Sequence, residues 1–295
     1  MKKLNFKNFN SNTVYTIMVY TLAIVAALLW LYPLVYVVSA SFSDPNALLN
    51  GEVVLLPKGF NLNAYKYIFQ NKQILVGYGN TIFYSVVGTL YNMVLTICAA
   101  YPLSRSDLKG RNLLTVMITF TMFFGGGMIP TYLNLNSLHM LNTRWVMFVP
   151  AAISATNFII MRNYFTHSVP GELIESAHIE GASQLQILSK IVLPLSKPIL
   201  GVLTIYYMAG HWNAYFSAII YLSDENLMPL QVFLRRVLII GGMEGMSSGS
   251  TMTDNVIYES LKYAIIVVST LPMLIGYLLV QKSFKKGIMM GSLKG

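Results

Sequence analysis

The segment 170–198, PGELIESAHIEGASQLQILSKIVLPLSKP, differs from the apolar sequence on either side of it and decides how the chain is organised. It predicts two short helices. Pro170 suits a first helical turn, and the glutamates that follow it lie near the positive end of the helix dipole. Gly181 permits a sharp change of direction, and apolar residues at helical spacing predict a second helix over about 183–192. The prolines at 194 and 198 then redirect the chain.

Outside this segment the chain is strongly apolar. Of its 295 residues, 55% are hydrophobic and 11% are charged, against roughly 25% charged in a typical soluble domain. A helix that crosses a bilayer needs about 20 mostly apolar residues, and six stretches meet this requirement. The sequence therefore predicts an all-α, polytopic membrane protein that forms one transmembrane domain over residues 1–295. The expected spans are 14–42, 77–103, 112–133, 144–165, 198–222 and 263–281.

The distribution of charge predicts the orientation of these spans. With a cytoplasmic N-terminus, thirteen basic and four acidic residues lie on the inner side, which then carries the whole net charge of +9. Seven basic and seven acidic residues cancel on the outer side. This asymmetry follows the positive-inside rule. We therefore expect a multi-pass protein of the cytoplasmic membrane with both termini, and the loop 170–194, in the cytoplasm.

The apolar stretch 227–243 is not expected to be a seventh span. Arg235 and Arg236 interrupt it, and each would cost several kcal/mol at the centre of a bilayer. We interpret it as an interfacial helix on the outer side. The long outer segments 44–72 and 224–262 either form a docking surface for an external partner or merely connect the spans.

Catalytic chemistry is not indicated. No glycine-rich loop is followed by Lys-Ser or Lys-Thr, so the chain has no P-loop for ATP. The four histidines show no metal-ligand spacing, and no paired catalytic carboxylates stand out. A basic stripe with interleaved aromatics is missing, which disfavours nucleic acid as a partner. We expect no enzyme activity, no metal site and no cofactor bound by this chain.

A transport function remains, and its energy source is the open question. Secondary transporters commonly place ionisable groups or broken helices within their spans, whereas these spans contain almost no acid or base. Energy then comes from a separate component, or the protein is passive. A secondary transporter or channel for a small polar solute is the alternative. Within the third span, Gly125, Gly126 and Gly127 mark either a flexible or closely packed helix segment or a gating hinge.

The loop resembles the EAA motif of permeases from ATP-binding-cassette (ABC) importers. The residues that carry the resemblance are Glu175, Ala177, Glu180, Gly181, Ala182, Ile191, Leu193, Pro194 and Pro198. The sequence departs from the family pattern at Ser176, where the family has a second alanine. The resemblance implies the type I ABC-importer permease fold with a cytoplasmic coupling-helix loop.

In such permeases this loop lies in a groove of the ATPase subunit. When the ATPase dimer closes around ATP, the loop transmits this movement to the membrane helices. The resemblance implies that Glu175 pairs with a basic group of the ATPase, that Ala177 permits close approach and that Gly181 makes the turn. The residues expected to couple to the ATPase are Glu175, Ala177, Glu180, Gly181, Ile191, Leu193 and Pro194.

Two further strings are similar to the carbohydrate-uptake branch, especially the maltose-type second permease subunit of systems for oligosaccharides and polysaccharide fragments. They are the pair Trp212 and Asn213 and the sequence GIMMGSLKG at 287–295. This resemblance implies a bacterial importer. Its partners would be a second homologous permease in a heterodimer, two ATPase subunits that hold ATP and Mg²⁺, and an extracellular or periplasmic sugar-binding protein.

The fifth span is rich in groups that bind sugars. Aromatic faces match the apolar patches of a sugar ring, and amide and hydroxyl groups match its hydroxyls. Tyr207, His211 and Tyr215 lie four residues apart and would share one helix face. With Trp212, Asn213 and, on the fourth span, Asn157, they are the candidate substrate-pathway residues. The alternative is that these side chains serve helix packing or an interfacial aromatic belt.

Overall fold

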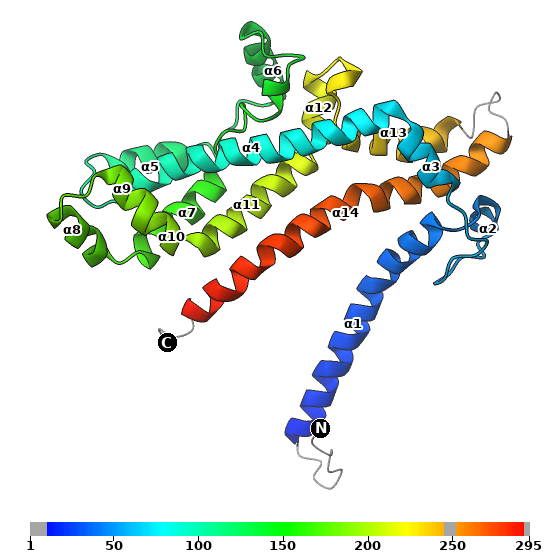
Figure 1. The fold of residues 1–295 in the computed structure, drawn as a ribbon, viewed down its shortest axis with the longest axis horizontal. Helices are drawn as coiled ribbons and strands as arrows, with labels where there is room; N and C mark the ends of the chain where they lie inside the picture. The colour runs from blue at the N-terminus through cyan, green and yellow to red at the C-terminus, as the bar shows by residue number, and fades with distance from the viewer. Residues whose placement is uncertain (1–10, 245–251, 292–295) are drawn as a thin grey trace. The chain divides into compact units, whose positions relative to one another are not determined.

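The computed structural model describes residues 11–244 and 252–291, and within these residues it contains helices and loops but no strand (Figure 1). The expected all-α class is confirmed. Lys2, Lys3, Lys7 and the last residues of the C-terminal string, 292–295, lie outside the described residues. The helices are α1 (Ser11–Ser41), α2 (Pro45–Leu49), α3 (Asn63–Gln70), α4 (Lys72–Ser104), α5 (Arg111–Phe120), α6 (Met128–Ser137), η1 (Arg144–Met147), α7 (Ala155–Ser168), α8 (Gly171–Ile179), α9 (Gln184–Ile187), η2 (Leu188–Val192), α10 (Leu193–Leu195), α11 (Lys197–Trp212), α12 (Tyr215–Tyr221), η3 (Glu225–Leu227), α13 (Leu230–Glu244) and α14 (Met252–Gly291).

Three of the described helices are long and apolar enough to cross a membrane. They are Tyr15–Ser41, Lys72–Ser104 and Tyr258–Leu278, with 27, 33 and 21 residues. They overlap the expected first, second and sixth spans. The pair Gln184–Leu195 and Lys197–Trp212, bent by 83°, would make a fourth if it is one broken span. Helix length and composition thus account for three or four spans among the described residues, and the expected count of six stays a prediction.

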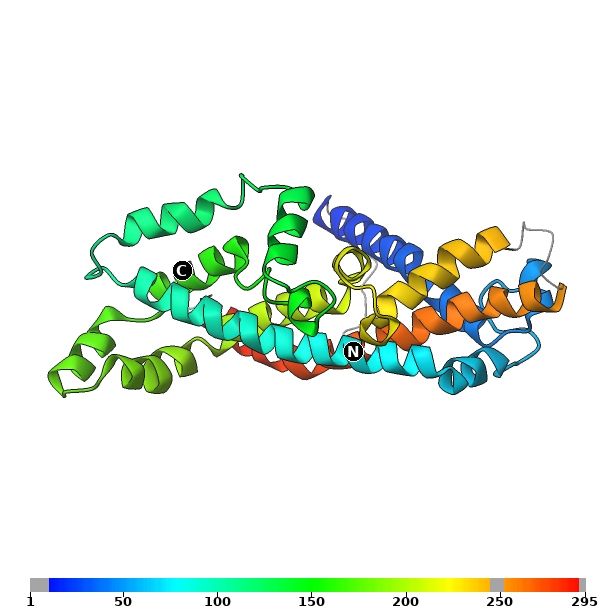
Figure 2. The same cartoon turned by 90° about the horizontal axis from the view of Figure 1, so that it is seen from above.

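The segment expected as the third span, 112–133, is not one continuous helix. The structure divides it into α5 and α6, two ten-residue helices joined by a turn and an irregular segment (Figure 2). The break contains the three glycines at 125–127, and Gly127 has φ +84°. Glycine loses the most backbone freedom on entering a helix and has no side chain to pack, so three in succession favour a break.

The fourth and fifth expected spans are also interrupted. Within 144–165 a 3₁₀ turn, η1, precedes a non-helical stretch around Pro150, and α7 begins only after Ser154. Ser154 caps α7, since its hydroxyl accepts a hydrogen bond from the backbone N–H of Asn157 at 3.4 Å. Within 198–222, α11 ends at Trp212 and α12 begins at Tyr215.

The chain expected to form one domain packs as two compact units. The first comprises 1–70 with 237–268, and the second comprises 71–236 with 269–295. The side chains of α1 between residues 15 and 34 are exposed in the isolated chain. A helix in a bilayer does not need to bury its apolar side chains within its own chain, because lipid or a partner helix covers them.

The part of the expected outer segment that lies in the first unit, 44–70, is folded against the end of α1. The Ser39 hydroxyl donates to the carbonyl of Leu55 at 2.6 Å, and the Tyr65 hydroxyl donates to Ser41 Oγ at 2.8 Å. Burial raises the pKa of the Tyr65 phenol, while its hydrogen bond to Ser41 acts in the opposite direction. This segment is therefore an ordered structure and not a loose connection.

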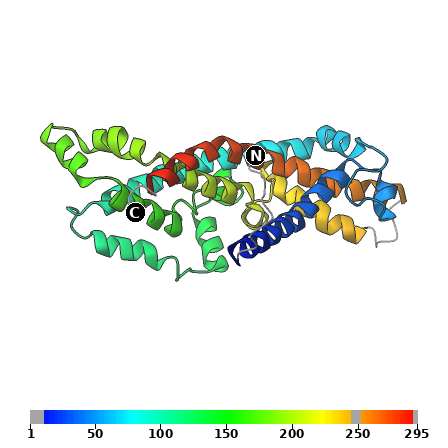
Figure 3. The same ribbon diagram turned by 90° about the horizontal axis from the view of Figure 1, so that it is seen from below.

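The second unit is built on α4, against which α7 and α11 pack. A core around the C-terminal half of α4 includes Phe158, Met161 and Leu203, and it extends into the loop after α7. A second core forms around Tyr84 in the N-terminal half and includes side chains of η1, α12 and α13. Figure 3 shows α8 and α9 beyond the C-terminal end of α4. The expected coupling residues and the expected substrate-pathway residues thus lie along one helix, α4.

Candidate functional site

The loop 170–194 forms a helix–turn–helix unit. Helix α8 ends in a pair of hydrogen bonds, from the N–H of Gly181 to the carbonyl of His178 at 3.0 Å and from the N–H of Ala182 to the carbonyl of Ala177 at 2.9 Å. This pattern is a Schellman motif, which requires a left-handed residue that is usually glycine. Gly181 has φ +80°, so the expected sharp turn at this residue is confirmed.

The second half of the loop begins with a strong cap and ends at a proline. The Ser183 hydroxyl accepts from the backbone of Gln186 at 3.3 Å, and the Gln186 side chain accepts from the backbone of Ser183 at 2.8 Å, which completes a capping box. The π-helical turn η2 then runs to Val192, just before Pro194. Because Pro194 has no N–H to donate, an α-helical ladder cannot continue unchanged through it. Here the chain bends towards α11.

The expected coupling residues divide between the surface and the interior. Glu175 and Glu180 are exposed, as is Pro194, while Ile191 and Leu193 are partly buried. Ala177 is only 8% exposed and packs into the chain's own core. Within this chain, the small side chain of Ala177 permits close approach between α8 and this core, and its expected role in coupling to the ATPase stays a prediction.

Two large apolar side chains project from the tip of the loop. Ile179 is 88% exposed and Leu185 is 77% exposed, on either side of the turn at Gly181. The inner face of the loop is buried through Ile174 and Ile187. An apolar tip bordered by glutamates, on a unit fixed to the core, has the chemistry of a surface that a partner covers.

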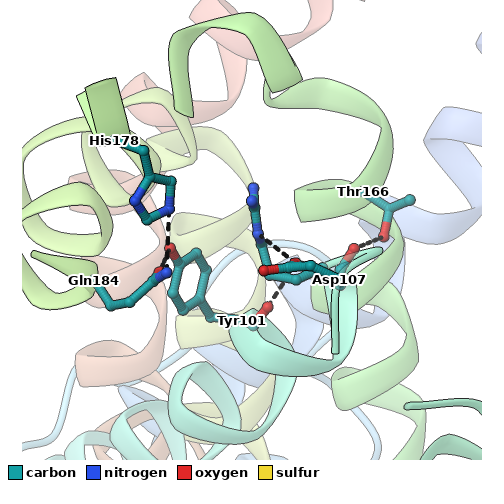
Figure 4. Close-up of polar contacts among 7 residues, drawn as sticks. Tyr101, Asp107, Thr166, His178 and Gln184 are labelled. Carbon is teal, nitrogen blue, oxygen red and sulfur yellow. Dashed lines mark hydrogen bonds and ion pairs between the residues drawn. The ribbon is translucent and has the colours of Figure 1, made fainter. Parts of the chain in front are cut away.

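A chain of polar contacts joins this loop to the end of α4 (Figure 4). The Tyr101 hydroxyl donates to Gln184 Oε1 at 2.9 Å, and Gln184 Nε2 lies 3.1 Å from His178 Nε2. The amide donates to this ring nitrogen when the imidazole carries its proton on Nδ1. Arg162 Nε also donates to the carbonyl of Leu103 at 3.0 Å, which fixes α7 to α4. Sequence reasoning missed Tyr101 and Gln184, because no local pattern pairs residues 83 positions apart.

Tyr207 lies in a polar cluster between α4, α7 and α11. Its hydroxyl shares a hydrogen bond with Thr96 Oγ1 at 2.7 Å and accepts from the N–H of Ser154 at 3.2 Å. Both Tyr207 and Thr96 are buried. A buried polar group that is fully paired contributes to packing specificity and costs stability when its partner is removed.

His211 makes the equivalent contact one turn further along α11. Its Nε2 donates to Asn92 Oδ1 at 2.5 Å, and Asn92 Nδ2 donates to the carbonyls of Ala151 and Ala152, both at 2.7 Å. The imidazole lies against Gly88, where a Cβ would be only 2.6 Å from Nε2. Glycine is therefore required at 88 for the close approach of the two helices.

These geometries separate the expected substrate-pathway residues into two groups. Tyr207, His211, Trp212 and Asn157 are buried within the chain. The Trp212 indole N–H donates to the carbonyl of Ser269 at 2.9 Å. These four occupy packing positions, as the alternative interpretation expects. Whether transport also uses them stays a prediction.

The other two residues, Asn213 and Tyr215, are exposed. The Asn213 side chain donates to the carbonyl of Ala209 at 2.9 Å and so caps the end of α11. Because the helix ends at Trp212, the expected single face carrying Tyr207, His211 and Tyr215 is wrong: the face stops at His211. Tyr215 belongs to α12 and lies under the guanidinium of Arg235, whose Cζ is 5.0 Å from the ring centroid.

The stretch 227–243, expected as an interfacial helix, contains α13, and the start of α13 is tied to α4. The Tyr84 hydroxyl donates to the carbonyl of Leu227 at 2.8 Å, and the N–H of Leu230 donates to Thr81 Oγ1 at 2.8 Å. Val232 and Phe233 are buried in the second core. This end of α13 is therefore a packed element that holds the side chains of Arg235 and Arg236 in place.

Comparisons with known proteins give relatives that match nearly the whole chain. The polygalacturonan/rhamnogalacturonan transport system permease protein YtcP of Bacillus subtilis (strain 168) is 40% identical over 289 residues, 96% of this chain and 99% of that protein. Protein LplC of the same organism is 42% identical over 264 residues, 89% of each chain. One chain of the crystal structure of a bacterial ABC transporter involved in the import of the acidic polysaccharide alginate is 36% identical, with a TM-score of 0.84, and the match covers 95% of this chain and 100% of that one. No protein-family model matches the chain.

Proposed function

The chain belongs to the carbohydrate permeases of ABC importers, as its loop and its two further sequence motifs predicted, and from this we propose that its substrate is an acidic oligosaccharide. The relative YtcP is named for polygalacturonan and rhamnogalacturonan, whose galacturonate units carry carboxylates. The solved structure with the same fold comes from an importer of alginate, described as an acidic polysaccharide. Both names support a uronate-containing substrate.

The observation that carries the mechanical part of the proposal is the form of the coupling loop. Its inner face is anchored in the core through Ile174 and Ile187, and its outer tip exposes Ile179 and Leu185. A small rigid element held in this way transmits a rigid-body displacement to the helices behind it. The ATPase would therefore move α4 and α11 by displacing α8 and α9.

The remaining components follow from the same proposal. Two ATPase subunits would bind ATP and Mg²⁺ beneath the membrane, and a second homologous permease would complete the pathway. An extracellular or periplasmic binding protein would deliver the sugar to the outer segments. Both termini would be cytoplasmic, with six spans in the assembled membrane protein. The exposed apolar surface of α1, and of α5 near Leu113, would then contact lipid or the second permease.

Affinity purification in mild detergent tests the assembly. The tagged chain is isolated from its native cells, copurifying proteins are identified by mass spectrometry, and ATP hydrolysis is measured on the eluate. We expect a second permease and a P-loop ATPase. An isolated chain that transports solute in liposomes without any ATPase would support the secondary-transporter or channel alternative.

An Ile179→Asp and Leu185→Asp double variant tests the docking tip within the same experiment. Charged side chains there would have to be desolvated against the ATPase, so recovery of the ATPase should fall. Leu56→Asp, at an exposed leucine in the outer segment, is the matched control and should recover the ATPase normally. Equal recovery in both variants would place the ATPase elsewhere on the chain.

A further inference from the structure

Three arginines are held on aromatic rings around the core that surrounds Tyr84 in the second unit. The stacked pairs are Arg144 on Phe83 at 5.0 Å, Arg235 on Tyr215 at 5.0 Å and Arg236 on Phe233 at 5.6 Å, each measured from Cζ to the ring centroid. They extend from η1 and α13, and the core they surround also contains α12. Stacking restrains a long flexible side chain and so reduces the entropy lost when its N–H groups bind a ligand.

The three guanidinium groups differ in their polar partners. Arg236 forms an ion pair with Glu225 at 3.0 Å, and Arg144 reaches Asn80 Oδ1 at 3.5 Å. Arg235 is exposed, and among the described side chains no carboxylate lies within ion-pairing distance of it. Arg235 is thus a cation held on a ring, without an ion-pair partner among the described residues.

We propose that Arg235, held on the ring of Tyr215, binds the carboxylate of a uronate unit as the sugar passes this chain. The inference rests on the proposed function, because it names the residue through which the importer selects an acidic substrate. In the proposed topology, α12 forms the outer end of the fifth span, and η3 and α13 follow it on the outer side, where the sugar arrives.

The chemistry of the pair suits such a ligand. A guanidinium that lies over a ring keeps the N–H groups along its edge free, and two of them match the two oxygens of a carboxylate. Tyr215 is 39% exposed, and Phe216 lies beside it with 6.4 Å between ring centroids. Aromatic surface next to a fixed cation offers a uronate both contacts it needs, one for the C–H face of the ring and one for the acid.

The test uses the complete transporter, reconstituted in liposomes with its native binding protein. Flux is measured for an oligogalacturonide and for its methyl ester of equal length, which keeps the ring and loses the negative charge. For the wild type we expect a preference for the acid. In Arg235→Gln the acid flux should fall about tenfold, as expected for the loss of a charge-assisted hydrogen-bonded pair, while the ester flux stays unchanged. Arg235→Lys should keep part of the preference for the acid, because lysine retains the positive charge but lacks the paired N–H donors of the planar guanidinium.

The neighbouring arginine supplies the control. Arg236→Gln removes the same charge one residue away, but Arg236 is already paired with Glu225, so the ratio of acid flux to ester flux should not change. An unchanged ratio in Arg235→Gln, or an equal loss in both arginine variants, would overturn the inference. A wild type that shows no preference for the acid would instead refute the proposed substrate class. Every variant is checked for membrane insertion and subunit recovery before fluxes are compared.

Discussion

The hydroxyl of Tyr101 donates a hydrogen bond to Gln184 Oε1 at 2.9 Å, and this contact joins the last turn of α4 to the coupling loop. The loop is also held by apolar burial, but this contact fixes its register, since a hydrogen bond depends on direction in a way that apolar packing does not. Movement of α8 and α9 by a partner would therefore be transmitted to α4 through Gln184.

Tyr101→Phe tests this connection. It removes the hydroxyl but keeps the ring that packs in the core, so the stability of the chain should change by about 0.5–1.5 kcal/mol. We expect substrate-stimulated ATP hydrolysis to fall several-fold while basal hydrolysis is retained. Tyr67→Phe, at an exposed tyrosine of α3, is the control and should leave coupling intact. Full stimulation in Tyr101→Phe would show that the apolar contacts alone transmit the movement.

Gly181 tests the backbone geometry of the turn. Its φ of +80° costs a β-branched residue about 1–2 kcal/mol or more, whereas asparagine tolerates this region better. No atom lies within 4 Å of a Cβ built at Gly181, so the effect is one of backbone conformation and not of crowding. We predict that Gly181→Val and a bulky charged variant abolish stimulated ATP hydrolysis while the chain remains in the membrane, and that Gly181→Asn keeps most of it. Similar activity in the valine and asparagine variants would contradict this account.

Gly88 tests the contact between α4 and α11. A Cβ at this position would lie 2.6–2.9 Å from three atoms of the His211 ring, so Gly88→Ala should force the helices apart and destabilise the protein by about 1–3 kcal/mol. Gly79→Ala on the same helix meets no atom within 4 Å and serves as the control. Thermal unfolding in detergent should show a lower midpoint only for Gly88→Ala, and equal midpoints would mean that the helices do not pack this closely.

Tyr207 distinguishes a packing role from a substrate role. Tyr207→Phe removes the hydrogen bonds to Thr96 and Ser154 and leaves buried polar groups without a partner, so the midpoint of thermal unfolding should drop. Tyr206→Phe, at an exposed tyrosine, should have no effect on the midpoint. We expect the ratio of acid flux to ester flux to be the same in both. A changed ratio in Tyr207→Phe alone would return this residue to the substrate pathway.

Sequence reasoning succeeded where local chemistry decides the structure. The turn at Gly181 follows from a single backbone requirement, and the three long helices follow from apolar length alone. The helix expected from about Ser183 likewise begins there, at Gln184. Such features require no knowledge of what the segment packs against.

The remaining features depend on contacts that the sequence does not display. Apolar composition predicted helices across 112–133 and 198–222. The three glycines at 125–127 marked a hinge as one alternative in the first of these, but no local pattern marks the break at 213–214 in the second. Spacing placed Tyr207 and His211 on one face of α11 but could not show that this face is turned towards α4. The stacking of Arg235 on Tyr215 likewise joins two helices across a turn.

Uptake by the complete reconstituted transporter tests the central claim most directly. Labelled oligogalacturonide and a neutral oligosaccharide of equal length are supplied with the binding protein, with ATP or a non-hydrolysable analogue inside the liposomes. The account predicts accumulation of the acidic sugar against its gradient with ATP only, and little accumulation of the neutral one. Accumulation that does not depend on ATP, or that favours the neutral sugar, would contradict it.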